Sequence, residues 1–166
     1  MDNTNVKRTC CFTGHRPEKL DIGENEVKEL LLKSIYCAMA EGYDTFISGM
    51  ADGTDIWAAE TVIGLKKNGF NISLICAMPY PNFRIGKKDA DNHLRNYILE
   101  NSDYRVNVRN HYYSGCFQVR NKWMVDNSNL VIAVYTGIAS GTKNTIEYAT
   151  KQGRNVINVL NRKNAE

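Results

Sequence analysis

Long hydrophobic runs are missing from this sequence, which limits where the protein can reside. The longest apolar stretches, such as ISLICAM and NLVIAVY, are much shorter than the ~20 apolar residues of a membrane-spanning helix. The segment MDNTNVKRT also has no apolar core of the kind that a secretory signal peptide carries. We therefore expect a cytoplasmic protein without a membrane partner.

Paired cysteines are also missing, because the 5 cysteines are odd in number and none belongs to a C-x-x-C motif. Four of them lie among apolar residues, namely Cys10, Cys11, Cys37 and Cys76. We expect buried, reduced thiols that pack as small hydrophobic side chains. Cys116 and His111 have no second pair of ligands at a suitable spacing, so no metal site is predicted.

The chain has little excess of charge and no repeat, linker or low-complexity tract. Its formal net charge is +3, which is too small by itself to indicate a nucleic-acid partner. Hydrophobic residues make up 43% and charged residues 23% of the sequence, as in ordinary globular proteins. The length of 166 residues predicts one domain, spanning residues 1–166, with a substantial core.

Short apolar runs alternate with helical patterns almost from end to end. Strands are predicted at residues 6–13, 45–48, 72–78, 104–108, 129–135 and 155–160. Helices are predicted at residues 24–40, 56–69, 87–100, 117–128 and 142–153. This alternation indicates an α/β fold of three layers, with a mostly parallel sheet and helices on both faces. In such sheets ligands bind outside the carboxyl ends of the strands, where the strand order reverses.

Three glycine-containing loops follow predicted strands: TGHRPEKL, SGMADGTD and YTGIASGT. A loop of small residues that leads into a helix lets backbone N–H groups approach a ligand, and the helix N-terminus favours an anion. Gly141 can adopt a positive φ, while the polar groups of Thr142, Asn144 and Thr145 can donate to phosphate oxygens. A tight turn with Thr142 as N-cap would explain one such loop equally well, but two similar loops favour a ligand.

Charged residues near these loops are further candidates for the site. His15 and Arg16 directly follow the first strand and either bind a phosphate or carboxylate or anchor the loop. Asp52 and Asp55 flank a helix start, where they either cap the helix or contact a ribose or water. Arg120 lies either on a solvated helix face or in the site. The remaining candidate ligand-binding residues are Gly14, Ser48, Gly49, Gly53, Gly137 and Ser140.

Familiar cofactor motifs are absent. There is no G-x-G-x-x-G and no acidic residue at the end of the second strand, so NAD is not predicted and no cofactor is expected. GIASGTK has its Gly, Thr and Lys in the wrong order for a Walker phosphate-binding loop. The stretch RVNVRNHYY mixes basic and aromatic residues, a pattern that also suits single-stranded nucleic acid.

Taken together, five stretches resemble the YpsA-like branch of the SLOG superfamily. They are TGHRPEKL, SGMADGTDIWAAE, AMPYPNF, RNKWMVDNSNLVIAVYTG and SGTKNTIEYA, in this order over nearly the whole chain. The resemblance implies a Rossmann-like fold, a nucleotide or nucleotide-derived ligand and a possible homo-oligomer. It brings no settled reaction, although the branch is associated with bacterial cell division or stress.

A sister group, the LOG phosphoribohydrolases, carries an Arg-Lys-x-x-Met helix followed by a Pro-Gly-Gly-x-Gly-Thr-x-Glu-Glu loop. Arg120 and Met124 fall on the arginine and the methionine, whereas Asn121 replaces the lysine. The Gly-Thr pair is matched by Gly141 and Thr142.

The proline and paired glycines of the LOG loop have no counterpart here, and its catalytic glutamate falls on Asn144 or Thr145. Glu147 lies further along the predicted helix. If the chain cleaves an N-glycosidic bond, we expect Arg120 to stabilise the phosphate or the charge of the transition state, and Glu147 or an aspartate to act as the general acid–base.

A second sister group, the DNA-processing protein DprA, has a similar Ser-Gly-(Ser/Thr) loop and binds single-stranded DNA. We expect this chain to lack the additional domains that are usual there. The leading hypothesis is a cytoplasmic binding or sensor protein for a nucleotide or nucleotide-derived small molecule. The alternatives are a nucleotide N-glycosidase and a single-stranded nucleic-acid binding protein.

Overall fold

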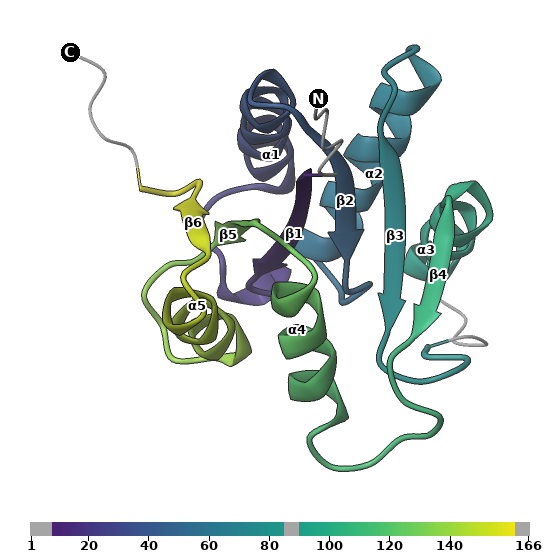
Figure 1. The fold of residues 1–166 in the computed structure, drawn as a ribbon, viewed down its shortest axis with the longest axis vertical. Coiled ribbons are helices and arrows are strands. Elements are labelled where there is room, and N and C mark those ends of the chain that lie inside the picture. The colour runs from purple at the N-terminus through teal and green to yellow at the C-terminus, as the bar shows by residue number, and fades with distance from the viewer. Residues whose placement is uncertain (1–7, 85–89, 162–166) are drawn as a thin grey trace, which may run out of the picture.

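A parallel sheet forms the centre of the fold in the computed structural model, which describes residues 8–84 and 90–161 (Figure 1). The 6 strands are arranged in the order β4-β3-β2-β1-β5-β6, and every pair of neighbours is parallel. Their bounds are β1 (Arg8–Gly14), β2 (Tyr43–Ser48), β3 (Ser73–Met78), β4 (Tyr104–Asn107), β5 (Leu130–Val134) and β6 (Asn155–Asn158).

Helices cover both faces of this sheet. They are α1 (Glu24–Ala40), α2 (Thr54–Lys67), α3 (Ala90–Asn101), α4 (Cys116–Asp126) and α5 (Gly141–Lys151), with a short 3-10 helix, η1 (Pro17–Lys19). Because crossovers between parallel strands are right-handed, the reversal of strand order after β4 moves the later helices to the opposite face. Figure 1 accordingly shows α4 and α5 in front of the sheet and α1 and α2 behind it.

The alternating strand pattern separates two layers of core side chains. Cys10, Phe12 and Phe46 face the layer of α1 and α2, whereas Cys11 and Ile47 face the layer of α4 and α5. Each of these side chains is at most 1% exposed, and complete burial of one such large apolar side chain contributes about 1.5–3 kcal/mol. Strands buried on both faces explain why the sequence shows continuous apolar runs.

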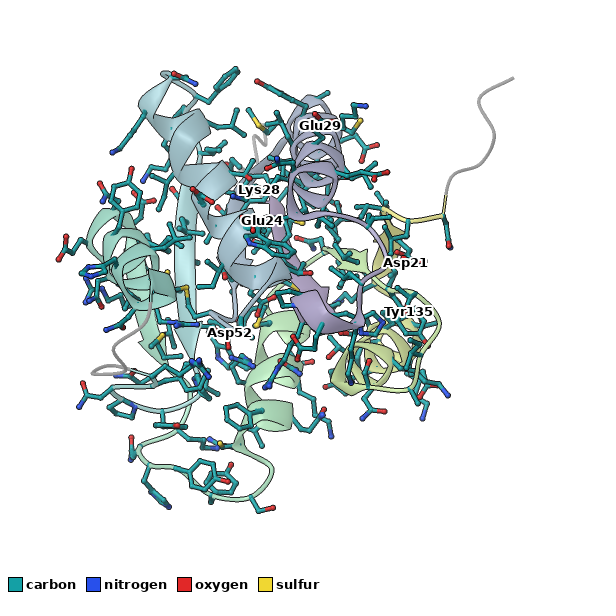
Figure 2. The ribbon with its side chains drawn as sticks, turned by 180° about the vertical axis from the view of Figure 1, so that it is seen from behind. Asp21, Glu24, Lys28, Glu29, Asp52 and Tyr135 are labelled. Carbon is teal, nitrogen blue, oxygen red and sulfur yellow. The ribbon has the colours of Figure 1, made fainter. Side chains whose placement is uncertain are left out.

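An ion-pair network links the first two helices on their outer side. Lys28 in α1 lies 2.7 Å from Glu24, one turn earlier, and 3.1 Å from Glu60 in α2 (Figure 2). These side chains are about one-third exposed or more, so we expect only a small contribution to stability. No helix within the described ranges is long and apolar enough to cross a membrane.

The predicted α/β fold is confirmed, and every predicted strand and helix is present. The helix predicted at residues 24–40 has the same bounds as α1, while most other boundaries differ by one to three residues. Residues 6–7 of the first predicted strand and 87–89 of the third predicted helix lie outside the described residues. The 3-10 helix η1 was not predicted.

The cysteine prediction was wrong at one position. Cys10, Cys11, Cys76 and Cys116 are buried free thiols, but Cys37 is exposed on α1. Ile35 and Ala38 are buried, but helical residues one or two positions apart do not share a face, so Cys37 is exposed together with Tyr36. Burial raises the pKa of Cys11 to about 12 and that of Cys76 to about 11, so both thiols stay protonated at neutral pH.

Two glycine substitutions test how the first loop is packed. A Cβ at Gly14 would lie 2.2 Å from Oγ1 of Thr54, whereas a Cβ at Gly64 in α2 would meet nothing within 4 Å. We expect Gly14→Ala to lower the free energy of unfolding by roughly 1–3 kcal/mol through overpacking. Gly64→Ala should raise it by about 0.5–1 kcal/mol through better helix propensity. Urea unfolding measures both, and a Gly14→Ala protein as stable as the native one would contradict the packing.

Candidate functional site

A cavity of about 320 Å³ lies where the strand order reverses, between β1 and β5. β1 pairs with β2 on one side and β5 on the other, so the connections that leave β1 and β5 run in opposite directions. The loops separate there and leave a crevice, as in other open parallel sheets. The residues that line this switch-point cavity are Phe12, Thr13, Gly14, His15, Arg16, Glu18, Lys19, Ala51, Asp52, Asp55, Arg120, Asn121, Ser140, Gly141 and Thr142.

Two buried arginines hold the loop between β2 and α2. Arg120 in α4 donates a hydrogen bond to the carbonyl of Gly49 and is 4% exposed, so it does not lie on a solvated face. Arg95 in α3 donates to the carbonyl of Met50 over 3.2 Å and is 1% exposed. Met50 has a φ of 61°, in the left-handed region that non-glycine residues rarely adopt. The two hydrogen bonds therefore secure a strained turn.

Asp52 on the same loop forms ion pairs with two arginines. Its Oδ1 lies 2.7 Å from Nη2 of Arg95, and its Oδ2 lies 3.1 Å from Nη2 of Arg84. Figure 2 shows Asp52 near the start of α2. The N-cap of that helix is Gly53, without a side-chain cap, so the interpretation of Asp52 and Asp55 as capping residues was wrong.

Asp55 is a buried carboxyl group at the base of the cavity. Its Oδ2 accepts a hydrogen bond from the backbone N–H of Ala51 at 3.3 Å. Burial raises the pKa of Asp55 to about 6, although the positive charge of Arg120 lowers it. Gly49 separates the two groups: a Cβ on it would lie 2.8 Å from Oδ2 of Asp55 and 3.1 Å from Cζ of Arg120. Only glycine leaves both side chains in place.

The loops after β1 and β2 also lock onto each other. Thr54 donates through Oγ1 to the carbonyl of His15 at 3.2 Å. Gly53 has a φ of 85°, and a Cβ there would lie 2.9 Å from Cδ of Pro17. Ser48 is fully buried and donates to the carbonyl of Asp55 at 2.8 Å. Ser48 and Gly53 thus shape the loops without lining the cavity.

His15 presents an unpartnered nitrogen within the cavity wall. The side chain is 2% exposed, and its Nε2 has no hydrogen-bond partner among the residues that the structure describes. Nδ1 lies 3.4 Å from Oγ of Ser140. Burial, with a smaller effect from the charge of Lys19, lowers the pKa of His15, so the ring is neutral at pH 7.

The N-terminus of α5 forms the opposite wall of the cavity. Its N-cap is Ser140, whose Oγ accepts from the backbone N–H of Lys143 at 3.4 Å, so the assignment of Thr142 as N-cap was wrong. The expected positive φ of Gly141 was also wrong: Gly141 opens the helix, and Gly137 takes the positive φ of 95°. Thr142 is buried and faces the cavity.

Besides Ser48, Gly49 and Gly53, four more residues predicted in the site do not line the switch-point cavity. Thr145 is buried and donates through Oγ1 to the carbonyl of Gly141 at 2.9 Å. Asn144 is exposed, and so is Glu147, which lies 3.8 Å from Lys143. Gly137 lines a different cavity. Glu147 therefore lies apart from the candidates that line the cavity.

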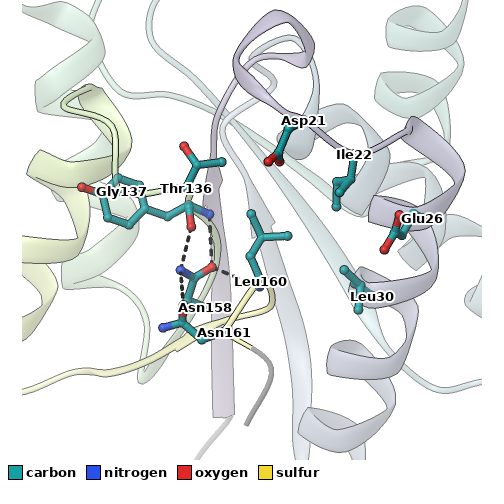
Figure 3. A pocket seen from close by; sticks show the side chains of 10 residues that line it. Asp21, Ile22, Glu26, Leu30, Thr136, Gly137, Asn158, Leu160 and Asn161 are labelled. Atoms are coloured by element: carbon teal, nitrogen blue, oxygen red, sulfur yellow. Dashed lines mark hydrogen bonds between the residues drawn. The ribbon is translucent and has the colours of Figure 1, made fainter. Parts of the chain in front are cut away.

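That second cavity, of about 580 Å³, lies between α1 and the ends of β5 and β6 (Figure 3). Asn158 braces its wall by accepting from the backbone N–H and donating to the carbonyl of Tyr135. The rings of Tyr135 and His15 are 5.3 Å apart and separate the two cavities. Asp21 and Glu26 are the charged residues among the described lining of the larger cavity, whereas Arg16, Lys19 and Arg120 balance the acidic residues of the smaller one. The smaller cavity is therefore the better candidate site for an anion.

Several residues of the switch-point cavity were not predicted from the sequence: Phe12, Thr13, Glu18, Lys19, Ala51 and Asn121. Lys19 and Glu18 belong to η1, and the GHRP motif gave a signal for that segment as a whole. Within the described ranges, no group of three or more His, Cys, Asp or Glu side chains is placed to hold a metal ion.

The sequence is similar to a known protein family. A family model named YpsA, described as the YspA SLOG family, matches residues 10–159. A UPF0398 protein of Bacillus thuringiensis (strain Al Hakam) is 24% identical over 155 residues, which cover 88% of this chain and 84% of the relative.

Two solved structures share the fold. DNA processing protein A (DprA) from Streptococcus pneumoniae has a TM-score of 0.64 and 20% identity, over 90% of this chain and 49% of DprA. The chain thus spans about half the length of that protein. The molybdenum cofactor binding protein from Rippkaea orientalis has a TM-score of 0.58 and 18% identity, over 92% of this chain and 76% of that protein.

The raised pKa of Asp55 makes a prediction about stability. A carboxyl group whose pKa rises from 3.8 to about 6 on folding favours the fold below pH 4, and this stabilisation is lost as the pH rises through 6. An Asn at this position does not titrate. We therefore expect the unfolding free energy of Asp55→Asn, relative to the native protein, to rise by about 2–3 kcal/mol between pH 4 and pH 7. Parallel pH profiles in denaturant titrations would contradict the burial of an ionisable Asp55.

Proposed function

Because the chain belongs to the YpsA (YspA SLOG) family, we propose that it is a cytoplasmic binding or sensor protein for a nucleotide or nucleotide-derived ligand. Membership confirms the resemblance that the sequence motifs indicated. The ligand's phosphate lies in the switch-point cavity, between His15 and the N-terminus of α5. The observation that carries this proposal is the buried, unpartnered Nε2 of His15.

The hydrogen bonds around His15 favour a proton on Nε2, which makes this nitrogen a hydrogen-bond donor. Ser140 accepts a backbone N–H from Lys143 and can therefore direct its own hydroxyl hydrogen to Nδ1 of His15. In the neutral ring the proton then resides on Nε2. A buried N–H without an acceptor costs about 1–3 kcal/mol, which an anionic oxygen in the cavity would recover.

The surrounding charges suit an anion with a phosphate. Arg16 and Lys19 are exposed where they line the cavity, and Arg120 lies buried in its wall. Glu18 and Asp55 line it too, but Glu18 is exposed to solvent and Asp55 faces the positive charge of Arg120. The carboxylate of Asp52 is neutralised by its two arginine partners, so it opposes an anion only weakly. The first backbone N–H groups of α5 add the favourable end of a helix dipole.

A second candidate function, cleavage of an N-glycosidic bond in a nucleotide, is favoured by one observation. The carboxyl group of Asp55 lines the same cavity and has a pKa of about 6, so it can hold a proton near neutral pH. A general acid that protonates a leaving base needs such a pKa. Asp55, rather than the exposed Glu147, is then the acid–base group.

A matched pair of substitutions tests the role of His15. The amide of Gln places a donor near the position of Nε2, whereas the shorter Asn reproduces only the side of the ring that faces Ser140. We expect His15→Asn to weaken binding of adenosine monophosphate roughly 10- to 100-fold and His15→Gln to retain most of it. Isothermal titration calorimetry measures both variants. Equal affinities of the native protein and His15→Asn would place the phosphate elsewhere.

A second pair of variants tests the N-terminus of α5. Thr142→Val removes a hydroxyl group from the cavity wall, while Thr150→Val makes the same change at an exposed position on the same helix. We expect an affinity for adenosine monophosphate about tenfold lower in Thr142→Val and unchanged in Thr150→Val.

A thermal-shift panel of mononucleotides and ADP-ribose that gives no shift at millimolar concentration would refute nucleotide binding itself.

Chromatography of released base separates the binding protein from the glycosidase. For a binding protein we expect no adenine from adenosine monophosphate, since the catalytic glutamate of the sister group has no equivalent here. If adenine appears, its release should be lost in Asp55→Asn and kept in Glu147→Gln. If adenine release is lost only in Glu147→Gln, the ligand contacts the exposed face of α5 that carries Glu147.

A further inference from the structure

An aromatic cluster at the edge of the switch-point cavity has no role in the phosphate site. It consists of Tyr80, Phe83, Tyr112 and Phe117, which we name the aromatic rim. We propose that the exposed rings of this rim stack on the base of a nucleotide whose phosphate lies beside His15. This inference rests on the proposed function and adds to it a subsite for the base.

The four side chains come from three separate segments and contact one another. The ring of Tyr80 lies 5.5 Å from that of Phe83 and 5.7 Å from that of Tyr112. The ring of Phe117 lies 5.7 Å from Phe83 and 6.3 Å from Tyr112. The planes meet at 59–83°, so the rings touch with edges and leave faces free.

The course of α4 places the rim beside the cavity. Phe117 lies three and four residues before Arg120 and Asn121, so the three side chains share one face of the helix. Arg120 and Asn121 line the switch-point cavity. Figure 1 shows that the first turn of α4 reaches past the carboxyl ends of the strands. Phe117 therefore continues the cavity wall outward.

The start of α5 lies next to the same turn of α4. A Cβ on Gly141 would lie 3.6 Å from Nε2 of Gln118, the residue after Phe117. The predicted phosphate site and the aromatic rim are thus joined by one turn of helix.

The outer rings of the rim are exposed and held in place. Tyr112 is 62% exposed and Phe117 is 37% exposed, whereas Phe83 is 7% exposed and supports them from below. The guanidinium groups of Arg120 and Arg95 lie 5.9 Å and 6.0 Å from the rings of Phe117 and Phe83. Rings fixed by such contacts lose little conformational entropy when a base stacks on them.

Stacking recognises the face of a base rather than its edge. Every base has such a face, so we expect little distinction between adenine and guanine. The face of a purine is larger than that of a pyrimidine, so we expect purine nucleotides to bind more tightly. Ribose 5-phosphate, which has no base, should bind only through the phosphate site. The difference between these ligands isolates the contribution of the rim.

Calorimetry with adenosine monophosphate and ribose 5-phosphate tests the proposal on Tyr112→Leu and Phe117→Leu. We expect the affinity for adenosine monophosphate to fall roughly 5- to 100-fold, as for other base–aromatic contacts, and that for ribose 5-phosphate to stay unchanged. Tyr112→Phe keeps a ring and should retain the affinity. Tyr104→Leu is the matched control, because Tyr104 is 60% exposed at the opposite, amino end of β4.

The outcomes separate this inference from the proposed function. If both leucine variants keep the native affinity for adenosine monophosphate while His15→Asn still weakens binding, base stacking on the aromatic rim is refuted. The proposed phosphate site is then unaffected. Equal affinities of the native protein for the two ligands would also refute base stacking on the rim. If neither ligand binds the native protein, the proposed function fails and the base subsite fails with it.

Discussion

The candidate site depends on hydrogen bonds from two buried arginines to two consecutive backbone carbonyl groups. Arg120 and Arg95 donate to Gly49 and Met50, and they come from helices on opposite faces of the sheet. A buried guanidinium group is costly unless its N–H groups are bonded, so these contacts stabilise only one path of the loop. Removal of either arginine would also free Met50 from its strained φ.

The rest of the cavity follows from that path. With Gly49 and Met50 fixed, α2 begins at Thr54, whose hydroxyl group holds the carbonyl of His15. His15 in turn meets Ser140 at the start of α5. A chain of contacts thus runs from α3 and α4 through the loop to both walls of the cavity, with Asp55 enclosed beneath it. This network fixes the two walls of the cavity relative to each other.

The sequence predicted the sheet and its helices well because their signals are local. Strands buried on both faces give apolar runs, and α1 shows a clear helical period with a C-terminal glycine. The position of the switch-point cavity at the carboxyl ends of the strands followed from the predicted topology. The site residues nearest to glycine loops, His15, Asp55 and Thr142, do line the cavity.

Features that depend on distant partners escaped prediction. Arg95 lies in a helix with a polar sequence, and only the fold shows that its partners are 43 and 45 residues away. Ser140 and Thr142 are both good N-cap residues, and the backbone alone decides between them. The exposure of Cys37 and the meeting of Tyr80 with Phe117 likewise depend on orientation in three dimensions.

The central claim, that His15 offers a hydrogen bond to a phosphate, can be observed directly by nuclear magnetic resonance. The chain has only 3 histidines, so long-range ¹H–¹⁵N spectra can resolve and assign the His15 ring. The account predicts a neutral ring with its proton on Nε2 at pH 7, and a shift of that nitrogen and its proton as adenosine monophosphate is added. A proton on Nδ1 in the free protein, or resonances that do not move at saturating nucleotide, would contradict it.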